Sequence, residues 1–172
     1  MKQGWTAAVV VAAAAMSVLI AVWALWPRTA TVAAPQTGQA QARQYLDASA
    51  CLLTGSSGVS HGTPGAQAWR AMESASQASH VMVSYLPSAG PADVPALLRT
   101  LAERKCGVIV VTGGSSKQVT SAARANPGHR FILVTTIAAA GPPALPPNAV
   151  IVSAANAAGR INQEVTALAG AS

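Results

Sequence analysis

Two loops rich in glycine and serine are the places in this sequence where a ligand could bind. The first is "TGSSGVSHGT", residues 54–63, and the second is "TGGSSK", residues 112–117. Their backbone N–H groups and hydroxyls could hold an anion or a sugar, helped by the N-terminus of the following helix. The same residue types also form ordinary strand-to-helix turns that need no ligand. The candidate binding residues are Ser56, Ser57, Gly113, Gly114 and Ser115.

Catalytic groups are scarce around these loops. "GGSSK" lacks the Gly-Lys-Ser/Thr ending of a phosphate loop, and neither "GSSG" nor "GGSSK" has the spacing of a hydrolase elbow. Only His61 is close to the serines in sequence, whereas His80 and His129 stand at the starts of predicted strands, at the opposite end of the sheet. The 5 acidic residues form no pair at a spacing suited to acid–base work. The sequence therefore predicts a protein that is not an enzyme.

Metal, cofactor and nucleic-acid sites are not indicated. The 2 cysteines have no CxxC spacing and no clustered histidine beside them, which argues against a metal site. The net charge is +6, but the basic residues are scattered and have no interleaved aromatics. A nucleic-acid footprint needs such residues gathered on one face. We therefore expect no cofactor, no metal and no nucleic-acid partner.

Apolar runs alternate with helical patterns along the globular part of the chain. The runs predict strands at 50–54, 80–86, 106–112, 130–136 and 149–154. Continuous apolar strands separated by helices indicate a parallel sheet that is covered on both faces. The expected fold is a three-layer, doubly wound α/β domain with strand order 2-1-3-4-5. In that order both glycine loops flank the switch point at the carboxyl edge of the sheet, where such folds bind ligands.

The same strand order predicts a disulfide. Cys51 and Cys106 lie at or beside the N-terminal ends of the first and third strands, which are neighbours in the expected sheet. Neighbouring strands are about 4.8 Å apart, within reach of a disulfide. Two buried thiols are the alternative.

The N-terminus has the pattern of a membrane helix. Residues 7–26 carry no charge, and 20 residues of helix span about 30 Å, the thickness of the hydrocarbon core of a bilayer. Trp5, Trp23 and Trp26 stand at its ends, where indoles favour the interface. A signal peptide cleaved after Ala33 is the alternative. We expect a tail at 1–6, a membrane helix at 7–26, a linker at 27–47 and an α/β lobe at 48–172, exported and held at the cell membrane by a single span.

Three segments together resemble a known family. They are "CLLTGSSGVSHGTPGAQAWRAMESAS" at 51–76, "CGVIVVTGGSSKQVTSAARANPGHRFILVTT" at 106–136 and "NAVIVSAANAAGRINQEVTALAG" at 148–170. In order and spacing the stretch from Cys51 to Leu168 resembles the first lobe of the basic membrane protein family. These are substrate-binding proteins of ABC transporters, related to purine-nucleoside receptors. The resemblance implies a periplasmic-binding-protein-like type I fold.

The chain departs from that family at the ligand positions. In the family the first loop ends in an Asp, and a Phe-Asn pair then grips the base and the sugar. Here His61 stands at the Asp position, and Pro64 and Gly65 stand at the Phe-Asn positions. The family also continues into a second lobe that closes over the ligand, whereas this sequence ends at Ser172.

The expected function is a membrane-anchored, extracytoplasmic binding or interaction domain that is degenerate for nucleosides, with a small molecule or a protein as partner. One alternative is a working small-molecule receptor, the binding component of an ABC transporter, that completes its cleft as a homodimer. The other is an enzyme that uses Ser56, Ser57 or Ser115.

Overall fold

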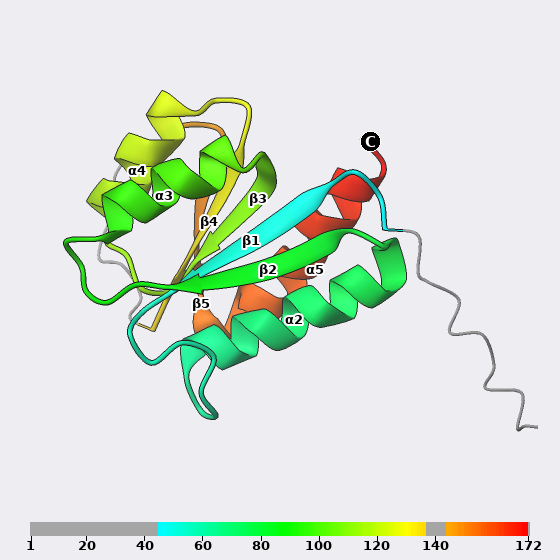
Figure 1. Cartoon of the computed structure of the whole chain (residues 1–172), viewed down its shortest axis with the longest axis horizontal. Coiled ribbons are helices and arrows are strands. Elements are labelled where there is room, and N and C mark those ends of the chain that lie inside the picture. Colours follow the sequence, from blue (N-terminus) through cyan, green and yellow to red (C-terminus); the bar gives the residue numbers. More distant parts are fainter. Residues whose placement is uncertain (1–44, 137–143, 172) are drawn as a thin grey trace, which may run out of the picture. The chain divides into compact units, whose positions relative to one another are not determined.

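A five-stranded, all-parallel sheet forms the centre of the domain. The computed structural model describes residues 45–136 and 144–171, with elements labelled as in Figure 1. The sheet order is β2-β1-β3-β4-β5, which confirms the expected α/β class and strand order. The strands are β1 (Ser49–Thr54), β2 (Met82–Pro87), β3 (Cys106–Val111), β4 (Arg130–Thr135) and β5 (Ala149–Ser153).

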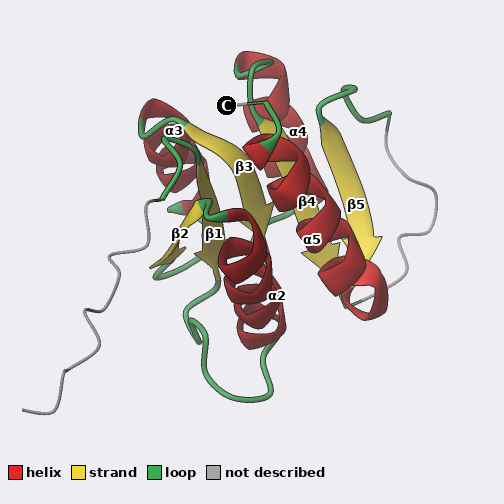
Figure 2. Cartoon of the chain, turned by 90° about the vertical axis from the view of Figure 1, so that its right-hand side faces the viewer, coloured by secondary structure: helices red, strands yellow, loops and turns green. Residues whose placement is uncertain are grey.

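Four helices cover the two faces of this sheet. They are α2 (Pro64–Ser79), α3 (Val94–Glu103), α4 (Ser116–Ala125) and α5 (Ala154–Ala169). Figure 2 shows α2 and α5 side by side on one face of the sheet. The other face is covered by α3 and α4, as Figure 1 shows. The three expected layers are therefore present in the described part of the chain.

Strand residues alternate between two cores because successive side chains of a strand point to opposite faces. Leu52, Val110 and Ile132 pack beneath α2 and α5. Leu53, Ile109 and Leu133 pack beneath α3 and α4. Since both faces of the sheet are buried, the strand sequences are continuous apolar runs and do not alternate between apolar and polar residues.

A bulge at the start of β3 changes the direction of one cysteine. Ser49 pairs with Cys106, but the next residue, Ala50, pairs with Val108, so Gly107 is an extra residue in β3. A bulge of this kind breaks the alternation of side chains across the sheet. Cys106 therefore points into the core under α3 and α4, the same core that holds Cys51.

One local expectation differs from the structure. The second strand was expected to begin at His80, but this residue ends α2 in the left-handed conformation (φ 59°), and its N–H donates to Ser76 O at 2.8 Å. The strand begins only at Met82.

The expected membrane helix at 7–26 lies outside the described residues, as do the tail at 1–6 and most of the linker at 27–47. Among the residues that are described, no helix combines the length and the apolar character needed to cross a bilayer.

Candidate functional site

The two glycine loops meet at the carboxyl edge of the sheet, between β1 and β3. Thr112 N–H donates to Leu53 O at 2.9 Å, which continues the strand pairing into the second loop. A Cβ added to Gly113 would lie 2.7 Å from Gly55 Cα and 2.8 Å from the carbonyl carbon of Thr54. Only a glycine allows the two backbones to come this close. The switch point therefore lies where the sequence predicts, but backbone atoms fill the space between the two loops.

The first loop is held by its own turns. Gly58 N–H donates to Gly55 O at 2.9 Å, and Thr63 Oγ1 donates to Ser60 O at 2.7 Å. Thr63 also caps α2, because its hydroxyl accepts from Ala66 N at 3.1 Å. The candidate residues Ser56 and Ser57 are exposed and form no side-chain hydrogen bond with other described residues. They are open to a ligand, but the described structure does not orient their hydroxyls.

In the second loop, Ser115 serves as the cap of α4. Its hydroxyl donates to Gln118 Oε1 at 2.9 Å and accepts from Gln118 N at 3.3 Å, while its own N–H donates to Gln118 Oε1 at 2.9 Å. Gln118 Nε2 donates in turn to Pro91 O at 2.8 Å, in the loop before α3. Both the donor and an acceptor position of the Ser115 hydroxyl are occupied, as in a capping box. The hydroxyl is therefore structural in this arrangement.

Gly114 is a packing position. An added Cβ would lie 3.0 Å from Val111 Cγ1 and 3.2 Å from Val94 Cγ1. The residue therefore seats the loop against the core under α3.

Two of the three residues that stand at the nucleoside-binding positions of the resembled family, Pro64 and Gly65, have no polar side chain. Pro64 is the first residue of α2, and His61 is exposed. Gly65 is buried, and a Cβ added there would lie 3.1 Å from Thr54 Cγ2 and 3.3 Å from the carbonyl carbon of Gly58. A larger residue at Gly65 would have no room in this loop conformation.

One serine motif escaped the sequence reasoning. Residues 58–62 read Gly-Val-Ser-His-Gly, which has the Gly-x-Ser-x-Gly spacing with Ser60 at its centre. In hydrolases this motif forms a sharp turn directly between a strand and a helix. Here Ser60 lies in the middle of a long exposed loop, between the end of β1 at Thr54 and the start of α2 at Pro64. The spacing occurs without its structural context.

A second group that escaped the sequence reasoning is the hydroxyl of Thr54. This residue ends β1 and is fully buried, and its Oγ1 has no hydrogen-bond partner among the described residues. Its backbone carbonyl accepts from Ser88 N at 3.0 Å. The sequence alone could not identify this buried hydroxyl, because a solvent-exposed threonine at the end of an apolar run would have the same sequence pattern.

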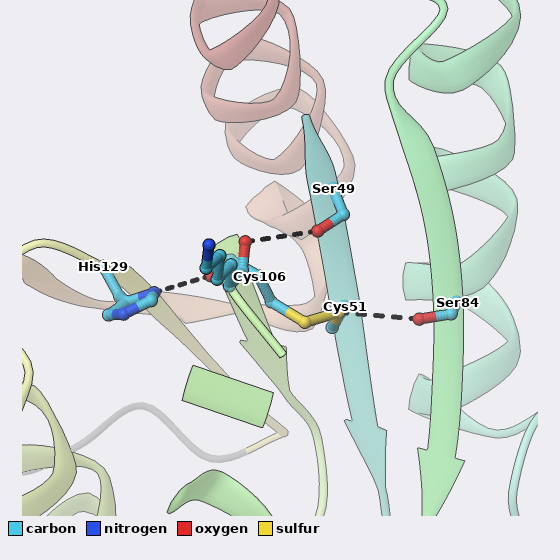
Figure 3. The surroundings of a disulfide bond; sticks show 6 residues. Ser49, Cys51, Ser84, Cys106 and His129 are labelled. Atoms are coloured by element: carbon cyan, nitrogen blue, oxygen red, sulfur yellow. Dashed lines mark hydrogen bonds between the residues drawn. A yellow bond between two sulfur atoms is a disulfide. The ribbon is translucent and has the colours of Figure 1, made fainter. Parts of the chain in front are cut away.

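The predicted disulfide is present at the opposite, amino-terminal edge of the sheet (Figure 3). Cys51 and Cys106 are bonded, with Cα atoms 5.7 Å apart, and both residues are buried. Ser84 Oγ, in β2, lies 3.5 Å from Cys51 Sγ. His129 Nδ1 is 2.9 Å from Cys106 O. The bond ties β1 to β3 within the core and is remote from the glycine loops.

Three charged side chains form ion pairs where the start of β4 meets α5. Arg130 and Arg160 both contact Glu164 Oε1, at 3.1 Å and 2.7 Å. Hydrogen bonds to the Glu164 carboxylate raise the pKa of Arg130 above its ordinary value; charge attraction adds to this, and partial burial opposes it. The Arg130–Glu164 pair joins β4 to α5, whereas the Arg160–Glu164 pair lies within α5. Among the described residues, no group of three or more His, Cys, Asp or Glu could hold a metal ion.

Comparisons with known proteins show the fold and no family. No protein-family model matches the chain, and no curated protein matches it. A fragment of a candidate lipoprotein from Peptoclostridium difficile 630 has a similar structure, with a TM-score of 0.57 at 16% identity over 69% of this chain and 99% of that one. The described domain therefore shares the fold of that fragment.

Two solute-binding proteins of ABC transporter systems are more distant. The protein from Conexibacter woesei DSM 14684 has a TM-score of 0.48 at 21% identity over 62% of this chain, and the one from Aeropyrum pernix K1 has 0.48 at 17% over 60%. This chain spans 35% and 28% of their lengths. At these scores the likeness carries no conclusion about this chain.

Proposed function

We propose that this protein is an extracytoplasmic binding or interaction domain, held at the membrane by residues 7–26, with a binding-protein-like lobe that has lost the nucleoside site. The observation that carries the proposal is the switch point itself. Its two loops keep the expected place, but Gly113 contacts Gly55 directly, Ser115 is used as a cap, and Gly65 has no room for a side chain. The shape of a ligand-binding corner is thus retained without a nucleoside clamp.

The part of the proposal that concerns export and membrane attachment rests on two features. They are the uncharged stretch at 7–26 and the disulfide, a bond that is typical of exported proteins. The full-length protein should stay in the membrane fraction after washing with high salt and with carbonate. A protease added from outside should digest the residues after 44 in intact cells. A soluble mature protein that begins near Ala34 would instead identify a cleaved signal peptide.

The loss of the nucleoside site is tested by calorimetry. Residues 43–172 form a compact unit of their own, and both core clusters lie within it. The chain from residue 44 onward is therefore the sample to titrate with adenosine and guanosine. We expect dissociation constants no tighter than millimolar, because a real pocket buries roughly 70–90% of a small ligand and a single lobe leaves one side wet. Micromolar binding that is lost in Gly114→Val would overturn this part of the proposal.

A receptor that completes its cleft with a second copy is the other candidate, and the β2 edge favours it. Met82 and Tyr85 are 44% and 46% exposed there, and the Tyr85 ring packs edge-on against Trp69 at 5.2 Å. No charged residue lies between Glu73 and Asp93, so the strand lacks the charges that usually protect an edge. Sedimentation of the chain from residue 44, with and without nucleoside, distinguishes this receptor from the degenerate domain. The receptor requires a dimer that binds the nucleoside more tightly than the monomer does.

The absence of enzymatic activity also belongs to this proposal, and a serine-directed fluorophosphonate probe tests it. We expect no labelling of the folded protein. Labelling that disappears in Ser56→Ala, Ser57→Ala, Ser60→Ala or Ser115→Ala would identify a nucleophile and reject the binding-only role.

A further inference from the structure

A groove runs between α3 and α4 on the outer surface of that helical layer. It has a volume of about 460 Å³, which lies within the range of about 300–1,000 Å³ that is typical of small-molecule sites. Figure 1 shows α3 and α4 as neighbours on the same side of the sheet. Its lining includes Pro95 and Arg99 from α3, and Lys117, Ser121, Ala122 and Ala125 from α4. None of these residues belongs to the candidate positions at the switch point.

Each helix contributes one cation to this groove. Arg99 comes from α3 and Lys117 from α4, and neither forms an ion pair or a side-chain hydrogen bond with the described residues. The groove lining contains no acidic residue. Glu103 follows Arg99 by one helical turn, but it lies beyond ion-pair distance and outside the lining. The groove is therefore a local concentration of uncompensated positive charge, and an anion between the two cations would stabilise both.

The helical layer on the opposite face of the sheet differs from this groove in how its cations are paired. There Arg130 and Arg160 share the carboxylate of Glu164, so the cations near α5 are compensated within the fold. The cations of the α3–α4 groove have no such partner among the described residues, although they lie on a surface where a carboxylate could have been placed.

The rest of the lining combines aliphatic residues with three uncharged polar ones, Gln118, Ser121 and Asn126. Pro95, Ala122 and Ala125 supply aliphatic surface between the two cations. A bare inorganic anion would leave this surface wet, whereas a neutral apolar molecule would leave both cations without a partner. Sites of this kind combine a mostly apolar lining with a few placed polar groups.

We infer that the α3–α4 groove binds a small organic anion, a molecule with an apolar body and one carboxylate, sulfonate or phosphate group placed between Arg99 and Lys117. This site lies between α3 and α4, next to the second glycine loop, and it does not depend on the proposed function.

Two fluorescent probes test the ligand class on the chain from residue 44. The anion 8-anilinonaphthalene-1-sulfonate has the required chemistry, and N-phenyl-1-naphthylamine is its neutral counterpart. The anion should bind saturably and about tenfold more tightly than the neutral probe, the gain typical of a charge-assisted contact. Equal binding of the two probes would show an apolar surface alone and would overturn the inference.

Matched variants locate the site. Arg99→Gln and Lys117→Gln should each weaken binding of the anionic probe by about threefold to tenfold. Arg124→Gln removes a cation from the same helix outside the groove, and Arg104→Gln does the same just after α3, so both should bind as the original protein does. All four positions are exposed, so unchanged urea-unfolding midpoints should accompany these results. Equal losses in all four variants would indicate general surface charge and reject a site.

Lysine chemistry gives a readout at a single residue. The chain from residue 44 contains only Lys105 and Lys117, and both are exposed. Saturating anionic probe should slow the acetylation of Lys117 several-fold in mass spectrometry, while Lys105 serves as the internal control. Equal rates at both lysines in the presence of probe would place the probe elsewhere and overturn the inference.

Discussion

Leu168, near the end of α5, packs directly against the backbone of Gly107 in β3. A Cβ added to Gly107 would lie 2.6 Å from Leu168 Cδ1 and 3.1 Å from Cδ2. Gly107 is also the extra residue of the bulge that turns Cys106 toward Cys51. One glycine thus serves both cores: it allows α5 to approach on one face, and it directs the disulfide into the other.

This contact predicts a change of sign in a double-mutant cycle. Gly107→Ala should lower the free energy of unfolding by about 1 kcal/mol, because Leu168 must move to accommodate the methyl group. In the Leu168→Ala background the same change should cost nothing or should stabilise slightly, since alanine is less flexible than glycine in the unfolded chain. Urea unfolding of the four proteins measures the coupling. Equal effects of Gly107→Ala in both backgrounds would show that Leu168 is not the obstacle.

The disulfide should contribute strongly to stability. It closes a loop with a sequence separation of 55 residues, and a loop of that size corresponds to about 4 kcal/mol in the chain-entropy model. The double variant Cys51→Ala, Cys106→Ala should lose about that much free energy of unfolding. Unreduced mass spectrometry of the exported protein should find the two peptides linked. Two freely alkylated thiols in that protein would contradict the bridge.

The contact between the two loops makes Gly113 intolerant of substitution. Gly113→Ala should destabilise the domain by about 2 kcal/mol, because the added methyl group would meet the backbone of Gly55 and Thr54, which cannot rotate away. Gly128→Ala is the matched control, since a Cβ there has no atom within 4 Å. Similar unfolding midpoints for both variants would mean that the loops do not touch in solution.

Asn148, just before β5, binds the turn between α4 and β4 through one amide group. Its Nδ2 donates to the carbonyl oxygens of Ala123, Asn126 and His129, at 3.0, 3.1 and 2.9 Å. Asn148→Ala should cost about 2 kcal/mol, because all three carbonyl oxygens lose this donor and, among the described residues, only Ala123 O and Asn126 O keep a backbone donor, from Asn126 N and His129 N. Asn148→Asp should cost more, since it points a carboxylate at three carbonyl oxygens. Thermal unfolding at neutral pH ranks the two variants, and the reverse order would show that the amide is not the organising group.

The unpaired hydroxyl of Thr54 predicts a stabilising substitution. Thr54→Val replaces a buried polar atom that has no partner among the described residues with a methyl group of similar size. The free energy of unfolding should rise by about 1 kcal/mol, since burial of an unpaired hydroxyl is costly. A loss of stability in urea unfolding would show that the hydroxyl has a partner in the folded protein.

The sequence by itself determined the class and the order of the sheet, because these follow from local patterns. Apolar runs such as 106–112 alternate with helical spacing, and parallel strands with right-handed crossovers then leave few arrangements. The same reasoning placed both glycine loops at one edge and Cys51 beside Cys106. It put the start of the second strand at His80, because an apolar run does not reveal a left-handed residue at a helix end.

Only the tertiary structure decided what these positions can do. The bulge at Gly107, the contact of Gly113 with Gly55, and the bonds of Asn148 all depend on the register and spacing between elements far apart in the sequence. Likewise, nothing in the spacing of Arg99 and Lys117 shows that they share a groove, because helix packing sets their positions. Residue patterns repeat over a few positions, so they determine which elements form and which faces are buried. Contacts between elements depend on how closely side chains far apart in the sequence fit together. That fit is decided only when the folded chain packs.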